Sequence, residues 1–222
     1  MLLRTLREEV AAYGRRLLAE GLTMHTGGNL SARDPASGLI AIKPSSVPYD
    51  TLRAEDITVI DPDGRVVEGA LRPSSEWPMH TLIYRTYGRA NAVVHCHSPL
   101  ASACAAAGRE LPLISHEICI YCSAPARVTP FAVPGTEELA RRAVEGFGAD
   151  NALALLQNHG TVAMGATLWH AFDAACAAEL TAKIYLAALP LGGAAVVPEA
   201  GRRALRAFDP MTHLKEPETV KL

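Results

Sequence analysis

A pair of histidines closes an apolar run and limits what this part of the chain can form. Residues 92–94 are Ala-Val-Val, a composition typical of a buried strand, and His95-Cys96-His97 follows directly. Successive side chains of a strand point to opposite faces of a sheet, so we expect His95 and His97 to share one face while Cys96 points to the other. Two imidazoles side by side provide half of a metal site.

Such a short motif needs further ligands, because this chain has eight histidines in 222 residues. His159 ends a second apolar, strand-like run and is followed by a glycine, and Glu76 opens a segment with helical character. Three imidazoles and a carboxylate suit a catalytic zinc, which takes three protein ligands and keeps one position open for water or substrate. The sequence therefore predicts a catalytic metal rather than a structural zinc, which prefers thiolates.

Composition sets limits on the class of protein. A chain of 222 residues that is 49% hydrophobic can bury one sizeable core, and we expect a single domain over residues 1–222. The formal net charge of -2 gives no basic surface for nucleic acid or an acidic membrane, so neither is expected as a partner. Five cysteines form an odd set without framework spacing, which favours a reducing, cytoplasmic location. Cys119 and Cys122 form a CxxC that we interpret as structural.

Hydrophobic periodicity predicts an α/β fold. We expect helices over residues 2–20, 76–87, 99–107, 136–147 and 168–188, and strands over residues 30–33, 38–42, 57–60, 92–96, 152–157 and 161–164. The early strands indicate an antiparallel meander, and the whole predicts a mixed, mostly antiparallel central sheet covered by helices on both faces. Residues 111–134 are expected to be irregular. Residues 190–222 are expected to form a C-terminal tail of uncertain order, solvated or docked on another subunit, with a basic patch at Arg202, Arg203 and Arg206.

Three clusters of small polar residues accompany the histidines. They are Thr26-Gly27-Gly28-Asn29, Lys43-Pro44-Ser45-Ser46 and Ser74-Ser75. Each occurs where a turn leaves backbone N–H groups free, and Ser74-Ser75 is expected to cap the helix that starts near Glu76. Backbone donors, hydroxyls and a helix N-terminus together bind phosphate. Each cluster alone would be ordinary turn chemistry. Three of them beside a metal constellation predict a phosphate site.

These motifs resemble the metal-dependent class II aldolases, a family that includes L-fuculose-phosphate aldolase and, as relatives, L-ribulose-5-phosphate 4-epimerase and the adducin head domain. The resemblance runs from about residue 2 to residue 188. It is carried, in order, by Gly28-Asn29-Leu30-Ser31-Ala32-Arg33, Ile42-Lys43-Pro44-Ser45, Val66-Val67-Glu68-Gly69, Pro73-Ser74-Ser75-Glu76, Val93-Val94-His95-Cys96-His97 and Asn158-His159-Gly160.

The resemblance implies Zn²⁺, one per subunit, on His95, His97 and His159. It implies Glu76 as the acid/base carboxylate, which also ligates the metal when substrate is absent. The substrate phosphate would be bound by the polar clusters, at Thr26, Gly28, Asn29, Ser45, Ser46, Ser74 and Ser75. The family further implies a cyclic homotetramer with active sites between subunits. The expected reaction is reversible retro-aldol cleavage of a ketose 1-phosphate, such as L-fuculose 1-phosphate, to dihydroxyacetone phosphate and a small aldehyde.

A second acid/base group is needed at the hydroxyl that becomes the aldehyde. The aldolases resembled here use a tyrosine from the neighbouring subunit, whereas His116 stands at the approximate position in this chain, with Tyr121 five residues further on. Both stay open as catalytic candidates. His25 and His80 flank the motifs and are interpreted as structural or supporting residues, while His170 and His213 are interpreted as ordinary helix and tail residues.

Other functions share parts of this pattern. L-ribulose-5-phosphate 4-epimerase resembles the segment from Ile42 to Val47, but Glu76 stands where the epimerases usually have aspartate, and the stretch before His159 lacks their insertion. A sugar-phosphate decarboxylase or dehydratase of the same superfamily also remains open. An adducin-like binding module or a simple zinc-binding protein would need no chemistry. The former predicts lost metal ligands, and the latter does not explain the phosphate clusters.

Overall fold

The computed structural model describes residues 1–207, and the polar end of the predicted tail, His213 included, lies outside the described residues. Within this described part of the chain, eight strands form one sheet in the order β4-β3-β2-β1-β5-β8-β7-β6. The strands are β1 (Asn29–Arg33), β2 (Ile40–Ile42), β3 (Thr58–Ile60), β4 (Val66–Glu68), β5 (Ala92–Cys96), β6 (Val128–Thr129), β7 (Leu153–Leu156) and β8 (Gly160–Gly165). Among the strands of residues 1–207, only β6 and β7 pair in parallel, so the sheet is mixed and mostly antiparallel, as expected.

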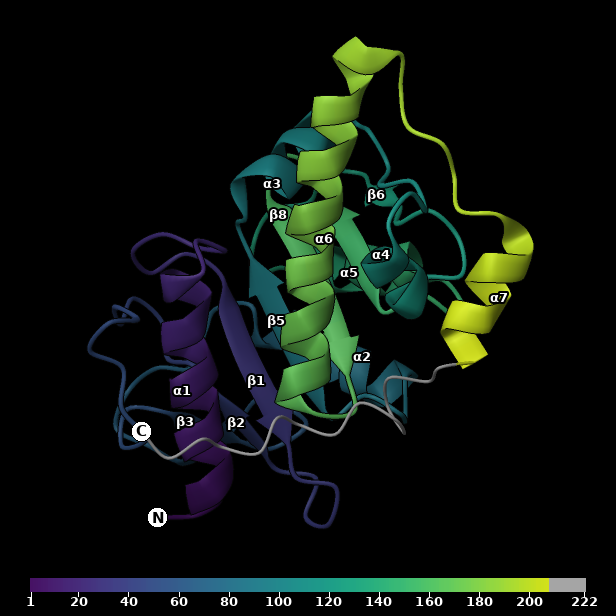
Figure 1. The fold of residues 1–222 in the computed structure, drawn as a ribbon. Helices are drawn as coiled ribbons and strands as arrows, with labels where there is room; N and C mark the ends of the chain where they lie inside the picture. Colours follow the sequence, from purple (N-terminus) through teal and green to yellow (C-terminus); the bar gives the residue numbers. More distant parts are fainter. Residues whose placement is uncertain (208–222) are drawn as a thin grey trace, which may run out of the picture.

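Helices cover both faces of this sheet (Figure 1). They are α1 (Arg4–Ala19), α2 (Trp77–Thr86), α3 (Pro99–Ala106), α4 (His116–Tyr121), α5 (Glu137–Phe147), α6 (Leu168–Ala188) and α7 (Glu199–Ala207), with a short 3-10 turn, η1 (Leu189–Leu191), after α6. One hydrophobic core joins α1, α3, α4 and α6 to one face of the sheet. A second core joins α2 and α5 to the other face. The predicted α/β fold is confirmed.

The alternation of side chains along β1 and β5 explains the two cores. Leu30 and Val94 belong to the core beneath α1 and α6, while Val93 belongs to the core beneath α2 and α5. Odd-numbered residues of both strands therefore face α2 and α5. Because His95 is on this odd-numbered side, it shares the α2 side of the sheet, and Cys96 is buried in the opposite core, as the sequence predicted.

The structure corrects three expectations about secondary structure. The meander has a fourth strand, β4, where the sequence predicted none; two of its three residues are exposed, which fits an edge strand. The supposedly irregular residues 111–134 contain α4, whose Ser115 side chain accepts from the Ile118 amide, and the two-residue strand β6. The expected tail contains η1 and α7, and α7 packs beside α4.

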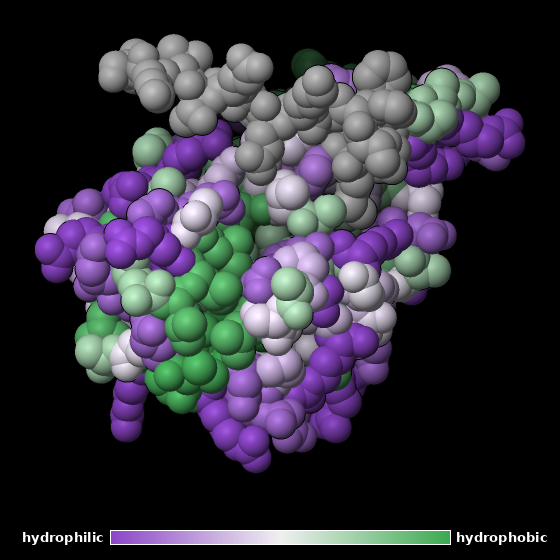
Figure 2. Space-filling model, turned by 90° about the horizontal axis from the view of Figure 1, so that it is seen from below, coloured by the Kyte–Doolittle hydropathy of each residue, from purple (hydrophilic) through white to green (hydrophobic). Residues whose placement is uncertain are grey.

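Some apolar surface stays exposed. Seen from below, a patch of hydrophobic side chains is bordered by hydrophilic ones (Figure 2). Leu191 and Val133 are among the most exposed apolar residues, at 85% and 60%. The segment Leu168–Leu191 is long and apolar enough to cross a membrane by length and composition alone. One apolar face of this segment is buried in the core, where α6 packs on β5, β8 and α3.

Candidate metal and phosphate site

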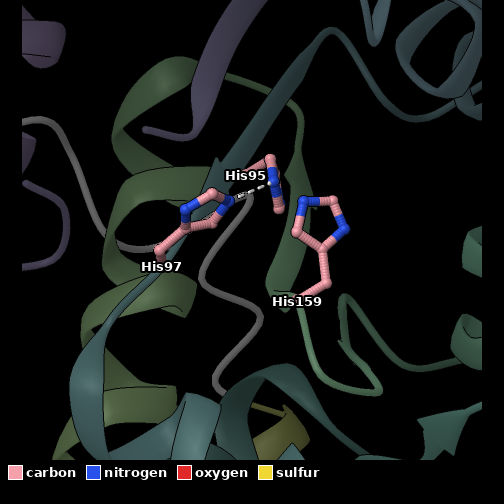
Figure 3. Close-up of side chains that lie close together, drawn as sticks. All are labelled: His95, His97 and His159. Carbon is pink, nitrogen blue, oxygen red and sulfur yellow. Dashed lines mark hydrogen bonds between the residues drawn. The ribbon is translucent and has the colours of Figure 1, made fainter. Parts of the chain in front are cut away.

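Three imidazoles converge at the end of β5. His95 is the next-to-last residue of β5, His97 directly follows the strand, and His159 lies in the tight turn between β7 and β8, with the three rings pointing toward one another (Figure 3). One ligand atom from each ring lies within 4.8 Å of the others. The Nε2 atoms of His95 and His97 are 3.0 Å apart. The sequence placed these three residues together, and the structure does the same.

The backbone of β8 fixes the orientation of the His95 ring. His95 Nδ1 lies 2.8 Å from the Thr161 carbonyl oxygen, which can only accept, so Nδ1 carries the proton and Nε2 presents its lone pair to the other histidines. Burial lowers the pKa of His95 to about 3 and, together with the neighbouring His95, that of His159 to about 4. Neutral imidazoles at pH 7 are the form that binds a metal.

Glu76 completes a set of donors that fits a divalent cation. Its Oε2 atom is 3.2 Å from His95 Nε2, and its Oε1 atom is 3.4 Å from His159 Nε2. Glu76 Oε1 and His159 Nδ1 are buried without a hydrogen-bond partner among the described residues. Zinc at about 2.0–2.1 Å from each nitrogen would separate its ligands by about 3.3 Å, close to the spacing present. A cation would therefore satisfy lone pairs that otherwise face one another.

Close packing of a glycine turn sets the position of the histidine strand. Gly28 has a φ of +67°, and a Cβ there would lie 2.5 Å from the His95 carbonyl oxygen. Asn29 pairs with His95 across β1 and β5. The absence of a side chain at Gly28 thus lets this turn lie directly against the backbone that carries the metal ligands.

The three polar clusters meet around one cavity of about 340 Å³. The Ser45 hydroxyl donates to the Pro73 carbonyl and accepts from the Ser75 amide, so two clusters 30 residues apart are joined directly. The helix cap differs from expectation by one residue, because Glu76 itself is the N-cap of α2 and the Ser74 hydroxyl accepts from its amide. The cavity is lined by Thr26, Gly28, Asn29, Lys43, Pro44, Ser45, Ser46, Ser74, Ser75, Glu76, His97, Pro134 and His159. All seven residues predicted for phosphate are among them.

Lys43 is a lining residue that the sequence reasoning did not select. It is 1% exposed, its Nζ donates to the Pro44 carbonyl, and it lies 4.5 Å from the centre of the Tyr49 ring. It forms no ion pair within residues 1–207, and burial lowers its pKa to about 8. The sequence did indicate this residue, because Lys43 directly follows the apolar strand β2 and belongs to the polar cluster Lys43-Pro44-Ser45-Ser46. A cation in this cavity favours an anionic ligand.

Neither candidate for the second proton donor lines this cavity. Tyr121 is buried in the core beneath α6, on the other face of the sheet, and donates to Asp173 Oδ2 at 2.6 Å. His116 begins α4, has a side chain that is 63% exposed, and pairs with Glu117. Within one copy of the chain, the structure therefore separates both residues from the histidine cluster.

Comparison with known proteins assigns this architecture to a family. Residues 8–186 match the model of the Class II Aldolase and Adducin N-terminal domain. The chain belongs to this class II aldolase and adducin family. The family resemblance proposed from the motifs is thereby confirmed.

Two class II aldolases match this chain over nearly its whole length. A 5-deoxy-D-ribulose 1-phosphate aldolase of Bacillus thuringiensis serovar kurstaki is 40% identical over 199 residues, which are 90% of this chain and 92% of the relative. The solved structure of an L-fuculose 1-phosphate aldolase superposes with a TM-score of 0.88 at 35% identity, covering 93% of this chain and 97% of that one. An L-ribulose-5-phosphate 4-epimerase of Salmonella paratyphi C is 43% identical over 109 residues, only 49% of this chain and 48% of the epimerase.

Proposed function

We propose that this protein is a metal-dependent class II aldolase, a lyase that reversibly cleaves a deoxy-ketose 1-phosphate to dihydroxyacetone phosphate and a small aldehyde. One observation carries the proposal. His97, His159 and Glu76 line the cavity whose remaining wall is made mostly of the polar clusters and Lys43, and His95 completes the histidine cluster behind them. Metal ligands and anion-binding groups thus border the same space. The relative named for 5-deoxy-D-ribulose 1-phosphate makes a 5-deoxypentulose 1-phosphate the first substrate to try.

His95, His97 and His159 would hold the metal, which we propose to be zinc because three imidazoles with one open position are typical of catalytic zinc. Bound zinc would supply a Lewis acid that polarises the ketose carbonyl and its neighbouring hydroxyl as negative charge develops on them. Glu76 would carry the proton to and from the carbon at which the bond breaks. Its buried position beside the cavity places a carboxylate there without bulk water around it.

The polar clusters and Lys43 would bind the phosphate. Binding of the phosphate holds the reacting carbon of the substrate at a fixed distance from Glu76. Binding energy gained at the phosphate, away from the bond that breaks, thus helps to orient the substrate. A ketose without phosphate should therefore react poorly. For the second proton transfer we propose His116 from a neighbouring copy of the chain, since an exposed residue can be offered to another subunit, whereas Tyr121 is buried and engaged with Asp173.

Homotetrameric assembly with sites between subunits, and a cytoplasmic location, are further parts of this proposal. They are supported by the family resemblance and by five cysteines that form no disulfide. Neither nucleic acid nor a membrane is proposed as a partner, in line with the near-neutral charge of the chain.

The test is a substrate panel on zinc-loaded protein. Release of dihydroxyacetone phosphate would be followed from 5-deoxy-D-ribulose 1-phosphate, L-fuculose 1-phosphate and L-rhamnulose 1-phosphate, with the dephosphorylated sugars as matched controls. We expect cleavage of at least one phosphate ester and very little of its free sugar. Zinc-loaded protein that cleaves none of them would contradict the proposal and would leave an adducin-like binding role.

An epimerase is the second candidate because of the match to L-ribulose-5-phosphate 4-epimerase. That match covers about half of each chain, while the aldolases match almost end to end. Adding L-ribulose 5-phosphate to the panel separates the two. Formation of D-xylulose 5-phosphate without release of dihydroxyacetone phosphate from any ketose 1-phosphate would favour the epimerase.

A further inference from the structure

A buried row of polar side chains leads from Tyr84, near the C-terminal end of α2, to Glu76. The Tyr84 hydroxyl lies 2.7 Å from Ser31 Oγ, which lies 2.7 Å from His80 Nδ1. His80 Nε2 lies 2.5 Å from Asn29 Oδ1, and Asn29 Nδ2 donates to Glu76 Oε2 at 2.6 Å. Every member is at most 5% exposed. The row ends on the carboxylate to which the proposed function assigns proton transfer.

Two periodicities bring these residues together. Asn29 and Ser31 are alternate residues of β1 and share its α2 side, while His80 and Tyr84 are four apart on α2 and share one face of that helix. The side chains of Asn29 and Ser31 on β1 therefore contact those of His80 and Tyr84 on α2. Because Asn29 also pairs with His95 on β5, the row ends beside the metal-ligating strand.

The hydrogen bonds of this row are consistent in only one direction when Glu76 is ionised. A carboxylate oxygen accepts, so Asn29 turns its Nδ2 toward Glu76 and its Oδ1 toward His80. His80 must then donate from Nε2. Burial lowers the pKa of His80 to about 3, so the ring is neutral and its Nδ1 accepts from the Ser31 hydroxyl. The Tyr84 hydroxyl is left to donate, and its one hydrogen lies between the Ser31 hydroxyl oxygen at 2.7 Å and the Ser31 carbonyl oxygen at 3.0 Å.

The two oxygens of Glu76 consequently differ. Oε2 receives the Asn29 amide, whereas Oε1 is buried without a hydrogen-bond partner within residues 1–207 and lies 3.4 Å from His159 Nε2. Asn29 keeps one amide hydrogen that is not used by Glu76, and the residue lines the cavity. Its amide can therefore bridge the carboxylate and a bound ligand only while its orientation is held.

We propose that His80 is a positioning residue: by donating from Nε2 to Asn29, it holds the amide on Glu76 Oε2 and leaves Oε1 as the oxygen that exchanges a proton with substrate. This inference rests on the proposed function, because it concerns proton transfer by Glu76. Without the His80 donor, the Asn29 amide is free to turn over. Asn29 Oδ1 would lose its donor, the amide could rotate away from Glu76, and the two Glu76 oxygens would lose their fixed roles.

Two variants of His80 test this role. His80→Leu removes the donor, while His80→Gln places an amide N–H near the position of Nε2. We expect His80→Leu to lower kcat by about 10- to 100-fold, the range seen when groups that orient metal-site ligands are removed, with KM and zinc content close to wild type. His80→Gln should recover most of kcat. The proposal would be wrong if both variants kept the kcat of the wild type, or if kcat fell equally in both.

His170→Leu is the matched control, because His170 is also a buried histidine. It lies beside Gly165, which pairs with Ala92 at the end of β5 away from His95. We expect His170→Leu to change thermal stability without changing kcat. If His80→Leu behaved in the same way, His80 would be a core residue only and the proposal would be wrong.

A second readout does not depend on activity. Neutron diffraction from crystals of the deuterated protein near pH 7 would locate the proton on His80, with deuterium expected on Nε2 and absent from Nδ1. Deuterium on Nδ1 alone would overturn the proposal whatever the kinetics. Failure of the wild-type protein to cleave any ketose 1-phosphate would instead count against the proposed function, since the proton position would still be measured.

Discussion

Asn29 donates its side-chain amide to Glu76 Oε2 at 2.6 Å, joining the first residue of β1 to the N-cap of α2. The bond crosses from the phosphate cluster to the proposed acid/base. A residue that the sequence assigned to ligand binding is thus also a support for the carboxylate. Both side chains are 5% exposed, so water does not replace this contact.

Glu76→Gln should remove proton transfer while keeping the shape of the site. The amide oxygen of glutamine can still accept from Asn29, but its nitrogen cannot take up a proton. We expect kcat to fall by about 10²- to 10⁴-fold, the usual range for a general acid/base, with zinc retained. Steady-state kinetics and metal analysis would check this, with Glu8→Gln on the exposed side of α1 as control. Full activity with bound zinc would remove Glu76 from this role.

Zinc should stabilise the folded protein through the three histidines. A ligand that binds only the folded state adds about 2.7 kcal/mol at a concentration 100 times its Kd. We expect the Tm of the metal-free protein to rise with zinc, and His97→Ala to lose most of that rise. Calcium is the matched ligand control, because it prefers oxygen ligands and should have little effect. An equal response of wild type and His97→Ala to zinc would place the metal elsewhere.

The turn at Gly28 should tolerate no side chain. Gly28 and Gly21 both have φ near +70°, so alanine costs about 1–2 kcal/mol of backbone strain at either position. Only at Gly28 does the new Cβ meet the backbone of His95; around Gly21 nothing lies within 4 Å. We expect Gly28→Ala to lower the free energy of unfolding further than Gly21→Ala, and to weaken zinc binding, by denaturant titration and calorimetry. Equal losses would mean that the contact between residue 28 and the His95 backbone does not affect the free energy of unfolding.

The sequence predicted the parts of the site that follow from local pattern. Alternation along residues 92–97 placed His95 and His97 on one face, and the ends of two apolar runs placed His159 beside them. The sequence could not give the row from His80 to Glu76, because it depends on how α2 lies across β1. The short helix α4 was also missed, since six residues show too little periodicity to mark a helix.

Lys43 should make stability depend on pH. Its pKa is about 8 in the folded protein and about 10.4 in an unfolded chain, so between these values the unfolded chain binds more protons and stability rises with pH. Below pH 8 the folded protein carries the full cost of a buried ammonium. Lys43→Met should therefore be more stable than wild type at pH 7, and this advantage should shrink as pH rises from 8 toward 10.4.

Urea unfolding at several pH values would measure this difference, with the exposed Lys183→Met on α6 as control. A gain that stays constant between pH 7 and pH 10 would show that the ammonium is not destabilising. We expect the same variant to raise KM for the phosphorylated substrate, because the cavity loses its cation.

His116 and Tyr121 should separate into one residue that affects activity and one that affects stability. Tyr121→Phe removes a 2.6 Å hydrogen bond from a buried tyrosine to the half-buried carboxylate of Asp173, so we expect the free energy of unfolding to fall by about 1.5–3 kcal/mol with kcat nearly unchanged. His116→Ala changes an exposed side chain, so stability should stay within about 0.5 kcal/mol. If His116 from a neighbouring copy is the second proton donor, kcat should fall by about 10²-fold or more. The reverse pattern, with activity lost only in Tyr121→Phe, would return that role to the tyrosine and require α4 to be arranged differently in the assembled enzyme.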